Sequence, residues 1–574
     1  MKKSAKHFRG YVKETILSPL FKLCEATLEL IVPLVIAKII DIGIVNKDTG
    51  YIVKMCLVLV LLGVIGLALS LTAQYFAAKS AVGFTTSLKK TLFNHMESLS
   101  YKDIDTLGTS TIITRMTTDA SRVQSGINLT LRLLLRSPFV VFGAMIMAFS
   151  INIDAGVIFA ITIPLLAIIV FGIMAITTPM HGKVQGLLDK ILAKTRENLS
   201  GARVIRAFAK EDAEVKDFDS KNDSLMLSQK NVGYISALLN PLTFVVINIF
   251  ILVLIHTGAV EVNSSDELTQ GGVIALYNYM SQILVELIKL ANLIITISKA
   301  IASLNRINSV TNTPSTQKFG TCDEAYESEY AIELRNVSLR YPHASEDAIT
   351  DINVKVKRGD VIGIIGGTGS GKTSLVNLIP RLYDATNGEV VLFGKNICDY
   401  TKEFLTNKIS IVPQKAVLFS GTIRDNMLWR KTDASDEEIL NAISIAQATN
   451  ILNNKDGLDT KIEAEGKNLS GGQRQRLTIA RALIGNPEVL ILDDSASALD
   501  YATDSKLNAS LKTIKDNTTI FIVSQRASSV IEADQIIVLD DGEVSSIGTH
   551  DELLANCPIY KEIYESQFGE VSRV

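Results

Sequence analysis

The stretch Gly366-Gly367-Thr368-Gly369-Ser370-Gly371-Lys372-Thr373 decides the fold of the second half of the chain. The apolar run 361–365 precedes it, and residues 374–379 follow with the apolar spacing of a helix. A G-x-x-x-x-G-K-[ST] motif between a strand and a helix predicts a loop whose backbone N–H groups surround phosphates. Lys372 is then expected to reach the β- and γ-phosphates, and the Thr373 hydroxyl to bind Mg²⁺. A glycine-rich turn that serves only packing is the alternative, which the strand and helix context disfavours.

Other stretches of the second half have the pattern of strands. They are residues 331–341, 389–393, 409–412, 489–492, 519–523 and 535–539. Helical patterns separate several of them, which favours an α/β core with a mainly parallel sheet. We therefore expect residues 331–574 to form one α/β nucleotide-binding domain. Residues 310–330, which are polar, acidic and short of apolar side chains, are expected to be a linker.

Residues 1–309 are expected to form an all-α membrane domain. The chain as a whole is 47% hydrophobic, and the excess of hydrophobic residues is concentrated in this half. A helix needs roughly 20 apolar residues to cross a bilayer. Six segments meet this length: 16–44, 55–78, 133–153, 155–176, 236–260 and 271–296. The gaps 87–124 and 180–230 mix charges with spaced apolar residues, which predicts helices that extend the spans. These helices are either a solvated stalk or a docking surface for the second half.

Charge and cysteine patterns narrow the class of protein. The basic N-terminal residues predict a cytoplasmic N-terminus by the positive-inside rule, which also places both long gaps and the 331–574 domain in the cytoplasm. The net charge of −3 shows no excess of basic residues of the kind that binds nucleic acid. The five cysteines are scattered without a C-x-x-C pair, which argues against a disulfide framework and a zinc site. A multi-pass protein of the cell membrane is the expectation.

Charged residues inside the predicted spans indicate polar faces. Lys22, Glu25 and Glu29 fall on one helix face, and Glu286 and Lys289 share another. Ionisable groups facing lipid are costly, so these faces are expected to point to a bundle interior or a water-filled cavity. A substrate cavity, internal salt bridges and snorkelling towards an interface all remain open. Under the first interpretation, Glu25, Glu29 and Glu286 would receive cationic amphiphiles.

Two further motifs follow the glycine loop. Leu469-Ser470-Gly471-Gly472-Gln473 precedes a helical pattern over 474–485, which predicts a second anion-binding helix N-terminus. An ordinary helix cap is the alternative for the pentapeptide alone. The apolar strand 489–492 then ends in Asp493, and a carboxylate at this point is where a P-loop protein holds Mg²⁺.

With these motifs the chain resembles, over essentially its whole length, a half-transporter of the ATP-binding cassette (ABC) exporter family. The matches are Walker A at 366–373, the Q-loop glutamine Gln414, the signature at 469–473, Walker B at 490–493 and the D-loop at 497–500. Segments 101–124 and 198–208 are similar to the two intracellular coupling segments of the family. The resemblance implies six spans per half and an ATPase that drives export across the cell membrane. It also implies two ATPs, each held between one chain's Walker motifs and the other chain's signature.

The resemblance assigns roles to individual residues. The expected ATP-binding residues are Tyr341, which would stack on adenine, with Gly366, Gly367, Thr368, Gly369, Ser370, Gly371, Lys372, Thr373, Ser374 and Gln414. The expected Mg²⁺ ligands are Thr373, Gln414 and Asp493. The signature residues expected to act in trans, on the partner's ATP, are Ser470, Gly471, Gly472 and Gln473.

Two departures from the family pattern predict an impaired site. Asp494 stands where the family has its catalytic glutamate, and Gln525 stands where it has the switch histidine. Asp is one methylene shorter, so its carboxylate lies back from the position of a general base, whose oxygen must lie within about 2.6–3.2 Å of the oxygen of the attacking water. Glutamine cannot become an imidazolium. We therefore expect this site to bind Mg-ATP and to hydrolyse it slowly.

The intact signature then favours a heterodimer whose partner supplies the glutamate and the histidine. Residues 460–466 also depart from the usual exporter form, so contacts there are not carried over from the family. The resemblance is to the degenerate-site subunit of bacterial heterodimeric multidrug exporters, with hydrophobic or cationic drugs as the expected substrates. A lipid or peptide exporter is the alternative within the class, and an ATP-gated channel or membrane regulator is the alternative outside it.

Overall fold

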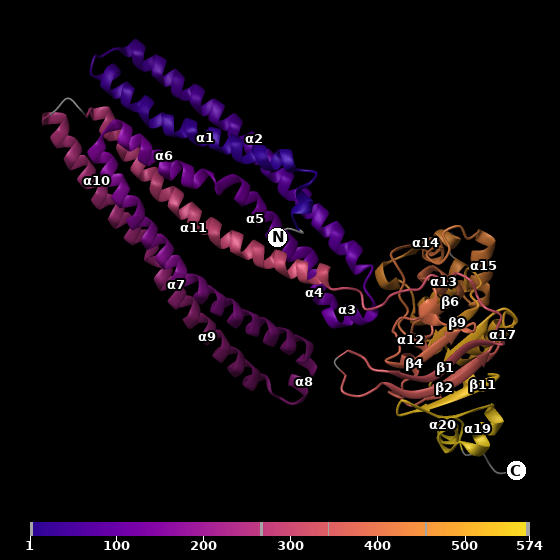
Figure 1. The fold of residues 1–574 in the computed structure, drawn as a ribbon. Coiled ribbons are helices and arrows are strands. Elements are labelled where there is room, and N and C mark those ends of the chain that lie inside the picture. Colours follow the sequence, from indigo (N-terminus) through magenta and orange to yellow (C-terminus); the bar gives the residue numbers. More distant parts are fainter. Residues whose placement is uncertain (1–3, 265–267, 343, 454–455, 570–574) are drawn as a thin grey trace. The chain divides into compact units, whose positions relative to one another are not determined.

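The computed structural model describes the chain except residues 1–3, 265–267, 343, 454–455 and 570–574. Residues 1–3, which include the basic Lys2 and Lys3 used in the prediction of a cytoplasmic N-terminus, lie outside the described residues. The chain divides into two compact units (Figure 1). The helical unit comprises residues 1–97 and 110–313, and the cassette unit comprises residues 98–109 and 314–574.

The helical unit consists of long helices joined by short connections. Its main helices are α1 (Val12–Lys38), α2 (Thr49–Met96), α5 (Ala120–Leu133), α6 (Arg136–Ile151), α7 (Ile153–Ser200), α9 (Glu211–Ala237), α10 (Leu239–Ser264) and α11 (Gln270–Asn312). Its shorter elements are η1 (Ser4–Phe8), η2 (Ile39–Ile44), α4 (Thr109–Thr114), η3 (Arg115–Asp119) and α8 (Ala202–Ala207). In Figure 1, α1 and α2 run side by side, as do α7 and α9.

Five helical stretches of the described residues are long and apolar enough to cross a membrane. They are Thr49–Met96, Thr109–Ile151, Ile153–Ser200, Glu211–Val262 and Gln270–Asn312. Each overlaps one of the predicted spans after the first, and only span 133–153 extends beyond its stretch, which ends at Ile151. The first predicted span, 16–44, falls on α1, whose 27 residues are long enough to cross but include Lys22, Glu25 and Glu29. Those charges set α1 apart from the other five, and its place as a sixth span stays a prediction.

The predicted extension of the spans by long polar helices is confirmed. Helices α2 and α7 have 48 residues each. At 1.5 Å per residue such a helix is about 72 Å long, more than twice the roughly 30 Å hydrocarbon core. The short helix α8 joins α7 to α9, and Lys194 of α7 forms an ion pair with Glu214 of α9 at 2.6 Å. Val204 and Phe208, at the α8 turn, are exposed.

The core of the helical unit is centred on α11. Tyr279, Met280 and Ile283 of this helix are fully buried. Small residues allow neighbouring helices to approach closely, as expected for helices that pack without a strong hydrophobic driving force. At Gly126 of α5, for example, an added Cβ would lie 2.2 Å from the Cβ of Ala300 on α11. This packing joins α11 to α1, α5 and α6.

The cassette unit is built on a six-stranded sheet in the order β12-β11-β3-β10-β9-β6. The strands are β3 (Val361–Gly366), β6 (Ile409–Val412), β9 (Val489–Asp493), β10 (Thr519–Val523), β11 (Gln535–Asp540) and β12 (Glu543–Gly548). Every neighbouring pair is parallel except β11 with β12. The predicted α/β fold with a mainly parallel sheet is therefore confirmed, and the predicted strands 409–412 and 519–523 have the observed bounds.

A second, antiparallel sheet in the order β2-β1-β4-β5 accompanies the first. Its strands are β1 (Tyr330–Leu339), β2 (Ile349–Lys357), β4 (Asn387–Leu392) and β5 (Lys395–Asn396), and a two-stranded ribbon pairs β7 (Gly421–Thr422) with β8 (Lys461–Ile462). The helices are α12 (Lys372–Leu378), α13 (Lys402–Lys408), α14 (Ile423–Leu428), α15 (Asp436–Ile445), α16 (Gly471–Leu483), α17 (Tyr501–Lys512), α18 (Ala527–Val530), α19 (His550–Asn556) and α20 (Pro558–Phe568). Sequence patterns predicted β1 and β4 but not that they form a separate sheet.

Two segments outside the predicted domain 331–574 belong to the cassette unit. One is the predicted linker, whose Gly320 N–H donates to the Tyr400 carbonyl at 3.0 Å. The other is α3 (Tyr101–Leu107), part of the first predicted coupling segment. The Tyr383 hydroxyl donates to the Asp105 carboxylate of α3 at 2.6 Å. The cassette unit thus includes a short helix that lies far from the rest of it in sequence.

Candidate functional site

The glycine loop connects the buried strand β3 to α12, as the motif predicts. Gly371 caps α12 with a φ of 92°, which favours glycine. A Cβ at this position would also lie 2.6 Å from the Ile349 side chain and 2.8 Å from the Ala348 carbonyl. The Lys372 ammonium lies inside the loop and donates to the Gly366 carbonyl at 2.8 Å and the Gly367 carbonyl at 2.6 Å. The loop therefore places a positive charge and a helix N-terminus at one point.

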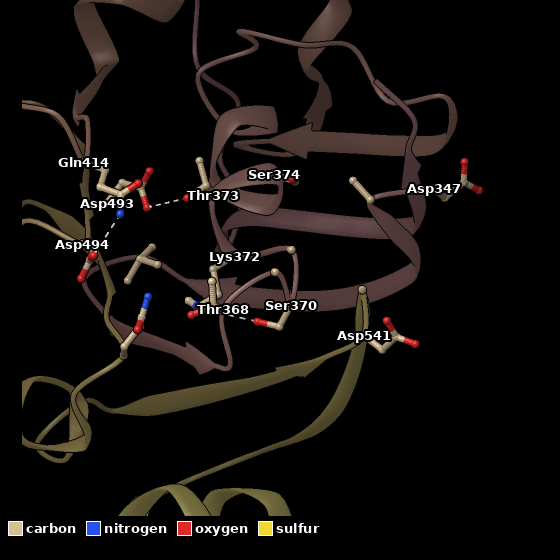
Figure 2. Close-up of a pocket in the computed structure, with 16 residues that line it drawn as sticks. Asp347, Thr368, Ser370, Lys372, Thr373, Ser374, Gln414, Asp493, Asp494 and Asp541 are labelled. Carbon is tan, nitrogen blue, oxygen red and sulfur yellow. Dashed lines mark hydrogen bonds between the residues drawn. The ribbon is translucent and has the colours of Figure 1, made fainter. Parts of the chain in front are cut away.

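A cavity of about 310 Å³ opens beside this loop, and we call it the nucleotide cavity (Figure 2). Its lining residues are Asp347, Ala348, Thr368, Gly369, Ser370, Gly371, Lys372, Thr373, Ser374, Gln414, Asp493, Asp494, Val523, Gln525, Asp541 and Gly542. The cavity thus collects predicted residues from the end of β9 and from the loops that follow β3, β9 and β10, which end at one edge of the parallel sheet. Tyr341 is adjacent, since its hydroxyl lies 3.1 Å from that of Ser374, whereas Gly366 and Gly367 contribute through the Lys372 contacts.

Lys372, Thr373 and Asp493 form a set suited to phosphates and a divalent cation. The Thr373 hydroxyl donates to the Asp493 carboxylate at 3.1 Å, and Asp493 is 3% exposed. Burial raises the pKa of Asp493; the Thr373 hydrogen bond opposes this shift, and the nearby charge of Asp494 adds to it. Burial lowers the pKa of Lys372, against the attraction of Asp494 and Asp493.

These buried groups have the chemistry of an Mg-nucleotide site. Oxygen ligands from a carboxylate and a hydroxyl are what Mg²⁺ takes in P-loop proteins, usually together with phosphate oxygens and water. The cation would offset the free-energy cost of burying the Asp493 carboxylate. The phosphates would likewise offset the cost of burying the Lys372 ammonium. Thr373 and Asp493 would hold Mg²⁺, and Lys372 with the loop backbone would hold the phosphates. The residues present therefore fit the implied cofactors.

The two departing residues, Asp494 and Gln525, both line the nucleotide cavity. They follow neighbouring parallel strands, because Asp493 pairs with Val523 at the ends of β9 and β10. The Asp494 backbone has a φ of 47° and donates to the Val523 carbonyl at 3.0 Å. The Gln414 amide donates to the Asp494 carboxylate at 3.2 Å, as the dashed line in Figure 2 marks. The shorter carboxylate is thus held by the Q-loop side chain.

The signature residues form the N-terminus of α16 and do not line the nucleotide cavity of the described chain. The Ser470 hydroxyl accepts from the Gln473 N–H at 3.3 Å, and the Gln473 side chain accepts from the Ser470 N–H at 2.9 Å. An added Cβ at Gly472 would lie 3.1 Å from the Ala498 carbonyl. The pentapeptide is thus a capping box next to the D-loop, and its action on a partner's ATP stays a prediction.

Sequence reasoning missed five lining residues: Asp347, Ala348, Val523, Asp541 and Gly542. Asp541 and Gly542 form the turn between β11 and β12, with φ angles of 45° and 83°. An Asp-Gly pair between two apolar runs is a strong hairpin signal, so this turn could have been predicted. Asp347 lies in the loop before β2 and forms an ion pair with Arg340 at 2.7 Å. No local pattern marks that position.

The charged residues that the sequence singled out within the predicted spans, Lys22, Glu25, Glu29, Glu286 and Lys289, are all paired. Arg136 of α6, which sequence reasoning missed, donates to Glu286 of α11 at 2.7 Å and to Glu29 of α1 at 2.5 Å. Glu286 also accepts from Ser137 at 2.7 Å and from Lys289 at 2.9 Å. We call these five residues the Arg136 network.

A second pair lies on α1, where Lys22 donates to Glu25 at 2.5 Å and to Ser70 of α2 at 3.0 Å. Internal salt bridges, one of the three interpretations left open by the sequence, therefore occur. A substrate contact by Glu25, Glu29 and Glu286 stays a prediction.

Comparisons with known proteins agree with this architecture. The family described as the ABC transporter transmembrane region matches residues 15–287, and the family described as ABC transporter matches residues 349–497. An uncharacterized ABC transporter ATP-binding protein, YfiB of Bacillus subtilis, is 36% identical over 572 residues, which cover 99% of both chains.

Two further proteins extend the comparison. The ATP-dependent lipid A-core flippase of Escherichia coli is 27% identical over 93% of this chain and 91% of its own. A solved structure of a bacterial Atm1-family ABC exporter with ATP bound has a TM-score of 0.76 and 21% identity, covering 99% of both chains. By sequence and by fold this chain therefore belongs to the ABC transporter family, as an exporter half-transporter that joins a multi-span membrane region to a cytoplasmic ABC-type ATPase whose hydrolysis is coupled to transport.

Proposed function

We propose that this chain is the degenerate-site half of a heterodimeric exporter that moves hydrophobic or cationic drugs out of the cell. Its own Walker motifs would bind Mg-ATP and hydrolyse it slowly, and its signature would complete the partner's site. The partner would supply the catalytic glutamate and the switch histidine. A B. subtilis relative, named a putative multidrug export ATP-binding/permease protein, is 29% identical over 99% of this chain, which supports the substrate class.

The contact between Gln414 and Asp494 carries the proposal of a slow site. Asp494 occupies the position of the general base, but its carboxylate is one methylene short of the glutamate it replaces. That carboxylate also accepts a hydrogen bond from Gln414 at 3.2 Å. A displacement of about 1 Å can cost on the order of 100-fold in rate. Gln525 can donate a hydrogen bond to a phosphate but cannot add a positive charge. Together these residues favour ATP retention over hydrolysis.

The signature is the chain's stronger contribution to catalysis in this proposal. The capping box of Ser470 and Gln473 orients the first N–H groups of α16, and a helix N-terminus with free N–H groups attracts phosphate. Closure of the two cassettes would bring this end of α16 to the partner's ATP. The exposed α8 turn, with Val204 and Phe208, would carry that motion as a coupling segment docked on a cassette.

The test is the ATPase rate of the purified pair, with the partner sought in the neighbouring reading frame. Asp494→Ala is expected to change turnover less than twofold, whereas alanine at the partner's catalytic glutamate is expected to abolish it. Equal losses from the two substitutions would refute the asymmetric model. Lys372→Ala serves as a matched control, because it weakens nucleotide binding at this site without touching the base position.

A lipid exporter is a second candidate, because the lipid A-core flippase of E. coli aligns over most of the chain. Inverted vesicles that contain the pair distinguish the candidates by ATP-dependent uptake of a cationic dye or of a fluorescent lipid. The triple variant Glu25→Gln, Glu29→Gln, Glu286→Gln tests the cationic interpretation. Unchanged dye uptake by a folded triple variant would remove that interpretation. An absence of any ATP-dependent uptake would favour a channel or a regulator.

A further inference from the structure

The loop that carries Gln525 is held by the C-terminal helix. We call residues 524–527 the switch loop. The Gln567 side chain of α20 accepts a hydrogen bond from the Ala527 N–H at 2.9 Å. The same amide donates to the Gln525 carbonyl at 2.8 Å. One side chain, 40 residues or more away in sequence, thus bridges two backbone groups of the loop (|i−j| of 40 and 42).

The helix that presents Gln567 is itself anchored in the cassette core. Tyr560 of α20 is fully buried, and Cys557 just before the helix is 3% exposed. The Tyr560 hydroxyl lies 2.8 Å from Nδ1 of His550 on α19. These contacts fix α20 at its start, while Gln567 lies near its end at Phe568. Gln567 thus extends from a helix whose start is held by packing in the cassette core.

The opposite side of the switch loop is tied to the D-loop. The Arg526 guanidinium donates to the carbonyls of Leu499 at 3.2 Å and Ser497 at 3.5 Å. The Ser497 hydroxyl in turn donates to the Asp494 carbonyl at 2.7 Å. The switch loop is thus bound between α20 on one side and the D-loop on the other.

Side chains, rather than strand pairing, hold the loop beyond β10. The Ser524 N–H still donates to the Ile364 carbonyl of β3 at 3.0 Å. The Arg526 N–H donates to the Ser524 hydroxyl at 2.9 Å, and the Ala527 N–H donates to Gln567. Because the sheet ladder ends at Ser524, the path of Gln525 depends on these side-chain bonds. Gln525 is also the loop residue that lines the nucleotide cavity.

We propose that Gln567 is a positioning residue that sets, through the Gln525 carbonyl and the Ala527 N–H, where the Gln525 side chain meets the γ-phosphate. The proposal rests on the proposed function, because it takes Gln525 as the γ-phosphate contact of a holding site. ADP lacks that phosphate. Loss of the Gln567 bridge therefore weakens ATP binding while leaving ADP binding in place, and the C-terminal helix controls how well the site distinguishes ATP from ADP.

The test measures Mg-ATP and Mg-ADP affinities of the full-length chain in nanodiscs, with fluorescent derivatives of both nucleotides. Gln567→Ala is expected to lower ATP affinity by about 3- to 10-fold, as a partial loss of the one Gln525 hydrogen bond to the charged γ-phosphate implies, and ADP affinity by less than about twofold. Gln525→Ala is expected to shift the ATP/ADP ratio in the same direction. Adding Gln567→Ala to Gln525→Ala is expected to have little further effect, since both act through one side chain.

Two further variants separate positioning from general stability. Gln567→Glu keeps the size of the side chain and the bond from Ala527 but cannot donate to the Gln525 carbonyl, so it is expected to reproduce most of the loss. Gln567→Glu also replaces Gln567→Ala in the affinity test if the alanine variant fails to fold. Glu562→Ala, at an exposed position of the same helix, is expected to leave both affinities unchanged.

The outcomes distinguish this proposal from the one on which it rests. A parallel fall of ATP and ADP affinity in the Gln567 variants, or the same loss in Glu562→Ala, would show a structural role and overturn the inference. An effect of Gln525→Ala without any effect of Gln567→Ala or Gln567→Glu would overturn the inference alone. No change of the ATP/ADP ratio in Gln525→Ala would overturn both, because Gln525 would then not contact the γ-phosphate.

Discussion

Replacing Arg136 by methionine is expected to destabilise the helical unit by about 3 kcal/mol. Removing one partner of a buried ion pair typically costs about 3–5 kcal/mol, because the other charge stays buried without compensation. Here that charge is Glu286, which is 3% exposed and bonded to Arg136 at 2.7 Å. Lys289 at 2.9 Å and Ser137 at 2.7 Å remain as partners, which puts the cost at the lower end. Glu29, with a side chain 42% exposed, adds no more than about 1 kcal/mol.

The double variant Arg136→Met, Glu286→Gln is the matched comparison. It removes both buried charges, and exchange of a buried pair for neutral groups of similar volume is often close to neutral in stability. We therefore expect the double variant to recover most of the loss. Lys289→Met is the control, because its side chain is 44% exposed and its pair with Glu286 is expected to contribute about 1 kcal/mol or less.

The assay is thermal unfolding of the purified full-length chain in nanodiscs, followed by a thiol-reactive dye. A loss of about 3 kcal/mol corresponds to a fall in Tm of about 5 °C, because a unit of roughly 300 residues has an unfolding entropy of about 0.6 kcal/mol/K. A double variant as unstable as Arg136→Met would refute the reasoning, since the unpaired Glu286 charge would not be the cause. An unchanged Tm in the single variant would show that the Arg136 network does not stabilise the fold.

Three other predictions concern the cassette unit. Asp494→Glu combined with Gln525→His is expected to raise hydrolysis at this site by about 10- to 100-fold, as the rate cost of a misplaced base implies. Hydrolysis at this site is measured as the ATPase rate of a pair whose partner lacks its own catalytic glutamate. An unchanged rate in the double variant contradicts the prediction. Lys372→Ala is expected to lower Mg-ATP affinity at least about 10-fold through loss of a charged phosphate contact; titration with a fluorescent nucleotide checks it, and an affinity within twofold of wild type argues against the assigned role. Asp504 is buried, and burial raises its pKa despite its 2.8 Å hydrogen bond from Ser529. The folded state therefore holds the proton more tightly, so stability falls as pH rises from the ordinary aspartate pKa through the raised one. Asp504→Asn is expected to unfold at a higher temperature than wild type at pH 7.5 and to lose this pH dependence, and parallel Tm profiles from pH 4.5 to 7.5 would rule this out.

Much of the cassette could be predicted because its signals are local. The order strand, glycine loop, helix is set by residues 361–379, and the apolar run before Asp493 marks the strand that presents it. Asp494 and Gln525 each follow such a strand, and parallel strands end at a common edge, so their approach in the nucleotide cavity follows from the pattern. The separate antiparallel sheet did not follow, although Ile352, Val354 and Val356 of β2 alternate with exposed residues. Pairing between strands depends on partners that a local pattern does not name.

In the membrane half too, the sequence predicted the local features and missed the contacts between distant residues. Hydropathy alone located five of the crossing helices, because each must satisfy its own backbone in lipid and so forms from a continuous apolar run. Hydropathy did not find the importance of Arg136, since one guanidinium near the start of an apolar run changes the mean hydropathy little. Its partners Glu29 and Glu286 lie 107 and 150 residues away, and only helix packing brings them within hydrogen-bond distance.

The sequence by itself determined the class of this protein, a membrane region joined to a P-loop cassette, and predicted a site with Asp494 and Gln525 where the family has glutamate and histidine. Those features depend on residue identity at fixed spacing along one strand, loop or helix. Only the tertiary structure decided which charges pair in the helical unit, that α3 belongs with the cassette, and that Gln567 bridges the switch loop. These contacts join residues far apart in the chain, and their geometry is set by the packing of whole helices and sheets rather than by any local pattern.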